Sequence, residues 1–269
     1  MKLHILTLTW NGSFLLQRLA PGLFHNLKNL GIDAQWYVRS NGCKDDSVSY
    51  LETLGNKVSI LKKDHNRDNF SQGVNSLANM AKVNLQERDL FLLLNNDIFF
   101  KDSESLKNML DVYIKHDPGI VGAKLNYTNT NKLQHGGVIF SSRYGNMPWH
   151  YRANEEEDSD ACRDRYFQAV TGACLLTPCD LFFKMGMLDE KFNWAFEDIA
   201  YNLKVVKSGK KVIYCGSTNI DHGESVSLKK NPVNKLMMEP NVKHFKAQYG
   251  SLYKIDHDLY LKNKEHCVI

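Results

Sequence analysis

The segment FLLLNNDIFF, residues 91–100, places a carboxylate within an apolar run. Four apolar residues lead into Asn95, Asn96 and Asp97, and apolar residues then resume. Burying an unpaired carboxylate is costly, so Asp97 needs a partner. Mg²⁺ and Mn²⁺ take oxygen ligands and need few protein carboxylates where substrate phosphates supply the rest. Asp97 is therefore a candidate metal ligand. The alternative is an aspartate that caps the next turn.

A second candidate group lies in FNWAFEDIAYNLKVVKSG, residues 192–209, which predicts a helix with Glu197 and Asp198 in its first turn. Acidic residues at this position can simply favour the helix dipole. A carboxylate held against a substrate hydroxyl is instead a general base. Adjacent helical residues point in different directions, so one carboxylate can be structural while the other enters a cleft.

A third candidate is His222, in the segment STNIDHGESVS that follows the predicted strand 210–216. An imidazole just past a strand end could complete a metal site. A lone histidine is more often an ordinary surface or core residue, and the segment alone does not decide between the two.

The elements that must position these residues alternate along the first half of the chain. Apolar periodicity predicts strands at 3–10, 34–40, 57–63 and 91–100, with helical pieces within 14–31 and helices at 46–55 and 71–84. This order predicts a doubly wound α/β sheet of parallel strands. Ligands of such sheets collect beyond the carboxyl ends of the strands, where Asn95, Asn96 and Asp97 are expected.

The second half is mixed. We expect helices at 103–119, 196–209 and 240–250, strands at 120–127, 134–141, 170–177 and 210–216, and an exposed loop at 155–165. Residues 224–240 have little periodicity and are expected to be mobile. The predicted organisation is a single domain with a first half at 1–100, a second half at 101–223 and a basic tail at 224–269.

Composition supports a globular protein: 43% of the 269 residues are apolar and 24% are charged. No segment reaches the roughly 18 apolar residues of a membrane span. Six cysteines without a CxxC pair, and an N-terminus unlike a secretory signal, favour a cytoplasmic location. The tail from Lys229 holds eight lysines and four acidic residues, so it accounts for the net charge of +4. Such a tail could contact the anionic inner face of a membrane, or it could be a solvated surface.

Several familiar motifs are absent from the sequence, namely GxGxxG, GxxxxGK[ST], GxSxG and HExxH. Dehydrogenase, P-loop kinase, α/β-hydrolase and zincin functions therefore lack their usual support.

The order and spacing of short segments resemble inverting GT-A glycosyltransferases of family 2, particularly the bacterial rhamnosyltransferase-like members. The most specific segment, residues 170–225, resembles the family signature around its Glu-Asp pair and the histidine that follows. The other matching segments are LTLTWNG, VRSNGCKDDS, DNFSQGVN, LLLNNDI, LQHGGVIF and KHFKAQYG. The resemblance implies the GT-A fold, a single α/β domain that joins a Rossmann-like nucleotide-binding half to an acceptor-binding half.

The resemblance also implies a role for each candidate residue. Asp97 would bind Mn²⁺ or Mg²⁺ and His222 would complete the metal site. Asp198 would be the catalytic base, supported by Glu197. Asn95 stands where many members have the first acid of an Asp-x-Asp motif. The implied reaction is transfer of a sugar from a nucleotide-diphosphate donor to an acceptor hydroxyl, with inversion, in glycan or polysaccharide synthesis.

The implied substrates are a UDP- or dTDP-sugar and a glycan or lipid-linked acceptor. The residues that would line the donor pocket are Thr9, Asn11, Ser40, Asn75, Asn95, Asn96 and Gly172. Those that would border the acceptor are Trp149, His150 and Trp194, although Trp194 could instead pack in the core. The sequence departs from the family pattern at Ser40, where an Asp is usual, and at residues 67–69, which replace an Asn-x-Gly with one residue extra.

Two other functions are possible for such a sheet. A sugar-1-phosphate nucleotidyltransferase usually has a Gly-rich, Arg-containing loop after its first strand, which TWNGSFLLQR lacks. A non-catalytic nucleotide-sugar-binding module would not need the Glu197–Asp198 pair together with His222. No groove-reading motif supports a nucleic-acid partner. A glycosyltransferase is therefore the favoured function.

Overall fold

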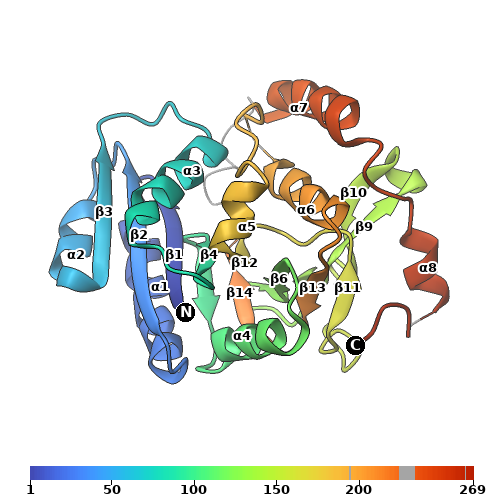
Figure 1. Cartoon of the computed structure of the whole chain (residues 1–269), viewed down its shortest axis with the longest axis horizontal. Helices are drawn as coiled ribbons and strands as arrows, with labels where there is room; N and C mark the ends of the chain where they lie inside the picture. Colours follow the sequence, from blue (N-terminus) through green and yellow to red (C-terminus); the bar gives the residue numbers. More distant parts are fainter. Residues whose placement is uncertain (194, 224–233, 264) are drawn as a thin grey trace.

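An eight-stranded sheet forms the centre of the molecule (Figure 1), in a computed structural model that describes residues 1–193, 195–223, 234–263 and 265–269. Its strand order is β11 (Arg165–Phe167), β13 (Val212–Cys215), β6 (Ile120–Ala123), β12 (Cys174–Pro178), β4 (Leu90–Leu94), β1 (Lys2–Thr9), β2 (Asp33–Asn41) and β3 (Val58–Lys63). Strands β1 to β4 pair in parallel, as do β6 and β13, whereas β11 and β12 are antiparallel to their neighbours. The expected parallel α/β arrangement is confirmed.

Helices cover both faces of this sheet. Helices α1 (Ser13–Asn29), α2 (Ser47–Thr53) and α4 (Ser105–His116) bury their apolar sides against one face. Helices α3 (Phe70–Ala81), α5 (Cys179–Lys184) and α6 (Glu197–Lys207) pack on the other face. The chain thus folds into three layers around two apolar interfaces.

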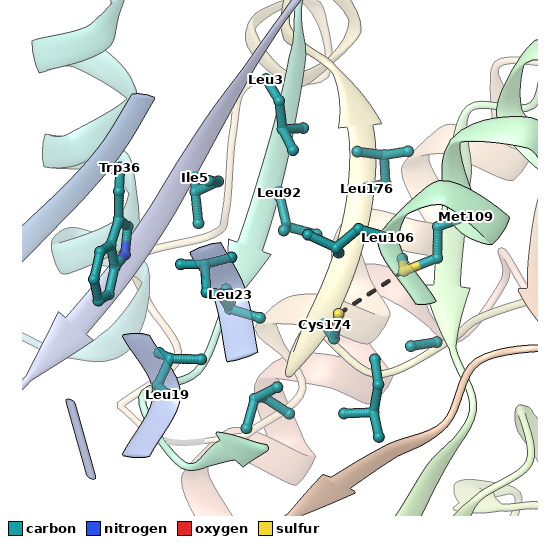
Figure 2. Close-up of a cluster of buried hydrophobic side chains, with 14 of the residues drawn as sticks. Leu3, Ile5, Leu19, Leu23, Trp36, Leu92, Leu106, Met109, Cys174 and Leu176 are labelled. Carbon is teal, nitrogen blue, oxygen red and sulfur yellow. Dashed lines mark hydrogen bonds between the residues drawn. The ribbon is translucent and has the colours of Figure 1, made fainter. Parts of the chain in front are cut away.

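Side-chain alternation in the strands explains the two interfaces. Leu3 and Ile5 of β1 join the cluster with α1 and α4, whereas Leu6 joins the cluster with α3. Figure 2 shows the first cluster, in which leucines of β1, β4 and β12 meet those of α1 and α4, and Cys174 lies against Met109 with their sulfur atoms 3.9 Å apart. Because both faces are buried, the strands read as nearly continuous apolar runs.

A smaller sheet stands beside the central one, with strand order β5 (Ile98–Phe100), β14 (Ile220–His222), β7 (Leu125–Tyr127) and β8 (Leu133–His135). Strands β9 (Val138–Ser141) and β10 (Met147–His150) form a hairpin. Helices α7 (Asn234–Tyr249) and α8 (His257–Lys262) end the chain, and short 3₁₀ turns occupy Gly55–Lys57, Lys82–Asn84 and Ser142–Tyr144. No helix of the described residues is long and apolar enough to cross a bilayer.

The single strand expected at residues 91–100 is wrong. The backbone of β4 leaves the central sheet after Leu94, and β5 pairs with β14 in the smaller sheet. The polar residues 95–97 lie between the two strands, and the Asn95 N–H donates to the carbonyl of Ala173 at 2.9 Å. The expected strands 120–127 and 134–141 also divide between two sheets, because neither apolar run reveals where its strand changes partner.

Two further expectations need correction. The segment 14–31 forms one continuous helix that contains Pro21, rather than helical pieces. Residues 234–240, expected to lack regular structure, form the first part of α7, so this helix begins before Pro240. The rest of that expectation, on residues 224–233, lies outside the described residues. Strands β10, β11 and β14 and helix α8 had no signal strong enough to predict them.

Candidate active site

Asp97 and His222 are brought together by the smaller sheet. The antiparallel register of β14 and β5 sets His222 opposite Ile98, the residue after Asp97. As a result, His222 Nε2 lies 3.1 Å from Asp97 Oδ1, with both side chains mostly buried. The next residue, Gly223, donates its backbone N–H to the Asp97 carbonyl at 2.8 Å. A Cβ at Gly223 would lie 3.2 Å from Asp97 Cβ, which explains why a small residue is needed here.

Gln134, a residue that the sequence analysis did not single out, orients the His222 ring. His222 Nδ1 and Gln134 Oε1 are 2.6 Å apart, and Gln134 is 5% exposed. Because an amide oxygen only accepts, the imidazole donates from Nδ1. In the neutral ring, Nε2 then carries the lone pair on the side of Asp97. The only sequence signal for this role is the position of Gln134 within the LQHGGVIF segment.

These groups fit a divalent cation that shares its coordination with a substrate. A carboxylate oxygen and an imidazole nitrogen converge, and the Gln134 side-chain oxygen fixes the imidazole ring from its other nitrogen, as is usual for metal-binding histidines. Across the described part of the chain, no three His, Cys, Asp or Glu side chains group into a fuller cage. Two protein ligands suit an ion whose other ligands are phosphate oxygens and water. Asn95 also approaches, with its Nδ2 3.4 Å from His222 Nε2.

Asp198, in the first turn of α6, is held by two backbone donors. Its Oδ2 accepts from the Gly172 N–H and its Oδ1 from the Ile199 N–H, each at 2.7 Å. A Cβ at Gly172 would lie 3.0 Å from Asp198 Cβ, so this close approach favours glycine. Burial raises the pKa of Asp198, and the N–H donors oppose that rise by stabilising the charged form.

Glu197 lies in a different environment from its neighbour. Its Oε2 is buried and has no hydrogen-bond partner. Burial, followed by the nearby charge of Asp198, raises the pKa of Glu197 to about 8. Two interacting carboxyls do not readily ionise together, and Asp198 accepts from two backbone N–H groups while Glu197 Oε2 is left without a partner. The pair therefore favours an ionised Asp198 beside a protonated Glu197 at neutral pH.

A short backbone path joins this pair to the metal-ligand candidates. Gly172, which binds Asp198, precedes Ala173, whose carbonyl accepts from the Asn95 N–H. The loop before α6 also holds two residues in the left-handed region, Ala195 with φ 65° and Phe196 with φ 74°. Such conformations are costly for residues other than glycine, and they are common at functional sites.

The expected donor-pocket residues Thr9, Asn11 and Asn96 gather at the carboxyl end of β1. Thr9 Oγ1 accepts from Asn96 Nδ2 at 3.1 Å, and Asn11 Oδ1 accepts from the Lys44 N–H at 2.8 Å. A Cβ at Gly12 would lie 2.6 Å from Thr9 Oγ1 and 2.7 Å from Asn96 Nδ2. This edge of the sheet is where ligands of open α/β sheets bind.

The two departures from the family pattern lie next to each other. Ser40 is buried at the end of β2, and the guanidinium of its neighbour Arg39 forms an ion pair with Asp68. The Arg39 hydrogen bond lowers the pKa of Asp68. Asn69 caps α3 in a reciprocal pair with Gln72, each backbone N–H donating to the other side chain at 2.9 Å. The segment 67–69 thus supplies an ion-pair partner and a helix cap.

Asn75, also expected to contact the donor, is engaged with the loop that precedes α6. Its Nδ2 donates to the Leu188 carbonyl at 3.0 Å and to Glu190 Oε1 at 2.9 Å, and its Oδ1 accepts from the Leu188 N–H at 3.1 Å. The amide is thus used to hold this loop, and donor contact by Asn75 stays a prediction.

Of the three residues expected near the acceptor, the structure describes two, Trp149 and His150. Trp149, 48% exposed on β10, stacks on Tyr144 with ring centroids 4.4 Å apart. The next residue, His150, bonds through Nδ1 to Nδ1 of His135 at 2.7 Å. Trp194 lies outside the described residues.

Comparisons with solved structures establish the fold. The chain is similar to GalNAc-T7 with UDP, GalNAc and Mn²⁺, with a TM-score of 0.69 and 12% identity over 94% of this chain and 49% of that one. It is similar to the mannosyltransferase PcManGT of Pyrobaculum calidifontis with GDP-Man and Mn²⁺, with a TM-score of 0.65 and 10% identity over 94% and 65% of the two chains. It is also similar to S. aureus TarS 1–349 with UDP-GlcNAc, with a TM-score of 0.57 and 12% identity over 98% and 77%. The chain has the GT-A glycosyltransferase fold.

Sequence comparisons add two partial relatives. The uncharacterized protein y4gI of Sinorhizobium fredii is 30% identical over 156 residues, 56% of this chain and 17% of that protein. The O-antigen biosynthesis protein RfbC of Myxococcus xanthus is 28% identical over 144 residues, 52% of this chain and 11% of that protein. The matches thus cover less than a fifth of either relative. No protein-family model matches the chain.

Proposed function

We propose that this chain is a metal-dependent, inverting glycosyltransferase that moves a sugar from a nucleotide-diphosphate donor to an acceptor hydroxyl. The observation that carries the proposal is a pair of arrangements: Asp97 lies against His222, and Asp198 accepts from two backbone N–H groups. The backbone at Gly172 and Ala173 links the two, because Gly172 binds Asp198 and Ala173 binds Asn95. Similar folds were solved with Mn²⁺ and with nucleotide or nucleotide-sugar ligands, which supports a donor of this class.

Asp198 acts as the base in the proposed reaction. Each of its oxygens has a second lone pair beyond the one used by a backbone N–H, so it can still accept a proton. Asp198 takes the proton of the acceptor hydroxyl while the hydroxyl oxygen bonds to the anomeric carbon. The bond from that carbon to the diphosphate oxygen breaks, and the single displacement inverts the configuration.

Asp97 and His222 would hold a divalent cation at the place proposed for the donor diphosphate. When bound, the ion supplies positive charge where the leaving oxygen becomes negative. Asp97 supplies a charged oxygen ligand, and Gln134 keeps the Nε2 of His222 available as a second ligand. The nucleotide is proposed to bind at the carboxyl ends of β1 and β2, against Thr9, Asn11, Ser40 and Asn96.

The proposed acceptor is a glycan or a lipid-linked glycan, in polysaccharide synthesis. The likeness to an O-antigen biosynthesis protein supports this choice. The exposed face of Trp149 offers an apolar surface for a sugar ring. The basic tail is proposed to contact anionic lipid headgroups at the cytoplasmic face of a membrane.

A thermal-shift panel of UDP-, dTDP- and GDP-sugars, with and without Mn²⁺, tests the donor. One donor should stabilise the protein in a concentration-dependent manner, and only with the metal. Consumption of that donor, by transfer or by hydrolysis, then separates an enzyme from a binding module. Metal-independent binding, or binding without turnover, would contradict the proposal.

A further inference from the structure

His135 and His150 form a hydrogen-bonded pair next to the candidate active site. Their Nδ1 atoms are 2.7 Å apart, and the rings meet edge to face at 85°. His135, on β8, is fully buried, whereas His150, the last residue of β10, is exposed. A bond between two ring nitrogens needs one donor and one acceptor, so the proton positions in the pair are linked.

A backbone contact fixes which ring donates. The Thr171 N–H donates to His135 Nε2 at 3.3 Å, so this nitrogen carries the lone pair. Burial lowers the pKa of His135 well below its usual range, with His150 and His222 acting in the same direction, so the ring is neutral. Its proton is then on Nδ1 and is donated to His150 Nδ1. Because His150 Nδ1 accepts this bond, the His150 ring is neutral and carries its proton on Nε2.

This pair borders the groups that were assigned to catalysis. Thr171 precedes Gly172, which binds Asp198, and Gln134, the neighbour of His135, binds His222. The exposed His150 ring therefore carries an N–H donor, and His135 links it to the segments that hold Asp198 and His222.

We propose that His150 donates a hydrogen bond from Nε2 to a sugar hydroxyl of the acceptor, and that His135 is a positioning residue that fixes the tautomer of His150. The proposal rests on the proposed glycosyltransferase function. A hydroxyl accepts such a bond through an oxygen lone pair.

Long-range ¹H–¹⁵N correlation spectra of protein labelled at histidine test the positioning part without any substrate. His150→Gln and His135→Asn remove one set of signals each and so assign the two rings. At pH 7.5, His150 should be a single Nε2–H tautomer in the wild type. His135→Asn, which keeps an N–H donor, should preserve that tautomer, and His135→Leu should yield a mixture. A charged or Nδ1–H His150 in the wild-type protein overturns the inference even if His135→Leu does not fold.

Kinetics test the contact with the acceptor. The probes are the donor identified by thermal shift and a panel of p-nitrophenyl glycosides, with hydrolysis of the same donor as the reference reaction. His150→Ala should raise the acceptor KM about tenfold more than it affects hydrolysis, as expected for one lost hydrogen bond. His150→Gln, which keeps an N–H, should recover most of the loss.

The remaining results of these assays would overturn either the inference or the proposed function. Equal losses of transfer and hydrolysis in His150→Ala would assign the residue to the donor side and overturn the inference, and so would unchanged kinetics. Hydrolysis by the wild type without transfer to any glycoside would overturn a sugar hydroxyl as the acceptor. If no donor is consumed at all, the proposed function itself fails, whereas the tautomer spectra still report on the histidine pair.

Discussion

Gln134 Oε1 accepts a hydrogen bond from His222 Nδ1 at 2.6 Å, on the side of the ring opposite Asp97. This single contact decides which nitrogen of His222 is available at the candidate metal site. It also joins β8 to β14, which are not neighbours in their sheet, because β7 lies between them. The orientation of the ligand therefore depends on a residue with no metal-binding chemistry of its own.

Replacing Gln134 by Met should weaken Mn²⁺ binding. Gln134 Nε2 has no hydrogen-bond partner, so the main loss is the bond to His222. Loss of such an outer-shell partner typically costs about 10- to 100-fold in metal affinity. Titration of Mn²⁺ in the presence of UDP measures the effect. Gln134→Glu, which keeps an acceptor oxygen, is the control and should bind far better than Gln134→Met. Equal affinity in all three proteins would refute the role.

The two carboxylates of α6 should differ in their effect on turnover. Asp198→Asn removes the proposed base and should lower kcat by about 10²- to 10⁴-fold with little change in the donor KM. Glu197→Gln keeps a neutral group and should retain kcat within about tenfold. Steady-state kinetics on both variants decides the assignment, with circular dichroism to confirm that each folds. A larger loss in Glu197→Gln than in Asp198→Asn would reverse the roles.

Glu197→Gln should also change how stability depends on pH. The folded-state pKa of Glu197 is raised to about 8, so between roughly pH 4.5 and 8 the unfolded chain loses its proton before the folded chain does. This group therefore destabilises the fold increasingly as pH rises. The variant should be more stable than the wild type at pH 8.5, by up to about 5 kcal/mol, and equal to it near pH 4.5.

Denaturant melts at the two pH values measure this difference. The matched control is Glu190→Gln. Glu190 is exposed, and its carboxylate accepts a hydrogen bond from Asn75 rather than lying against Asp198. An equal gain at both pH values would show that the effect comes from packing rather than from the proton of Glu197.

Asp68→Ala should lower the free energy of unfolding, because Asp68 pairs with Arg39, the neighbour of Ser40. The Arg39 guanidinium is almost fully buried and loses its ion-pair partner, while its bonds to Asn41 and Ser76 remain. Removing one partner of a buried pair costs about 3–5 kcal/mol, and partial exposure of Asp68 places the expected loss at the lower end. Urea unfolding measures it, with Asp64→Ala, at an exposed neighbouring position, as the control. Equal stability of the two variants would contradict a structural role for the pair.

Local sequence patterns were sufficient for the first half of the fold. The helices and strands up to β4 follow from apolar periodicity, because each is a short local repeat of apolar residues. The change of sheet at residues 95–97 was not predictable in this way. Residues 91–100 form one apolar run, and only pairing with the distant β14 shows that it contains two strands.

The candidate site shows the same division. Asp97, His222 and Asp198 could be selected by residue type and position, and the structure brings Asp97 and His222 into contact. Gln134, His135 and the Arg39–Asp68 pair gain their significance only from long-range contacts. A buried amide or arginine has no sequence signature that distinguishes a positioning role from an ordinary core contact.

Pulsed electron paramagnetic resonance of Mn²⁺ bound with UDP is the most direct measurement of the central claim. One manganese ion should show coupling to phosphorus from the diphosphate and to nitrogen from a histidine. The nitrogen coupling should disappear in His222→Ala, and Asp97→Ala should abolish the ternary complex. Manganese that binds UDP on this protein without a histidine coupling, or that is unaffected by both substitutions, would contradict the site.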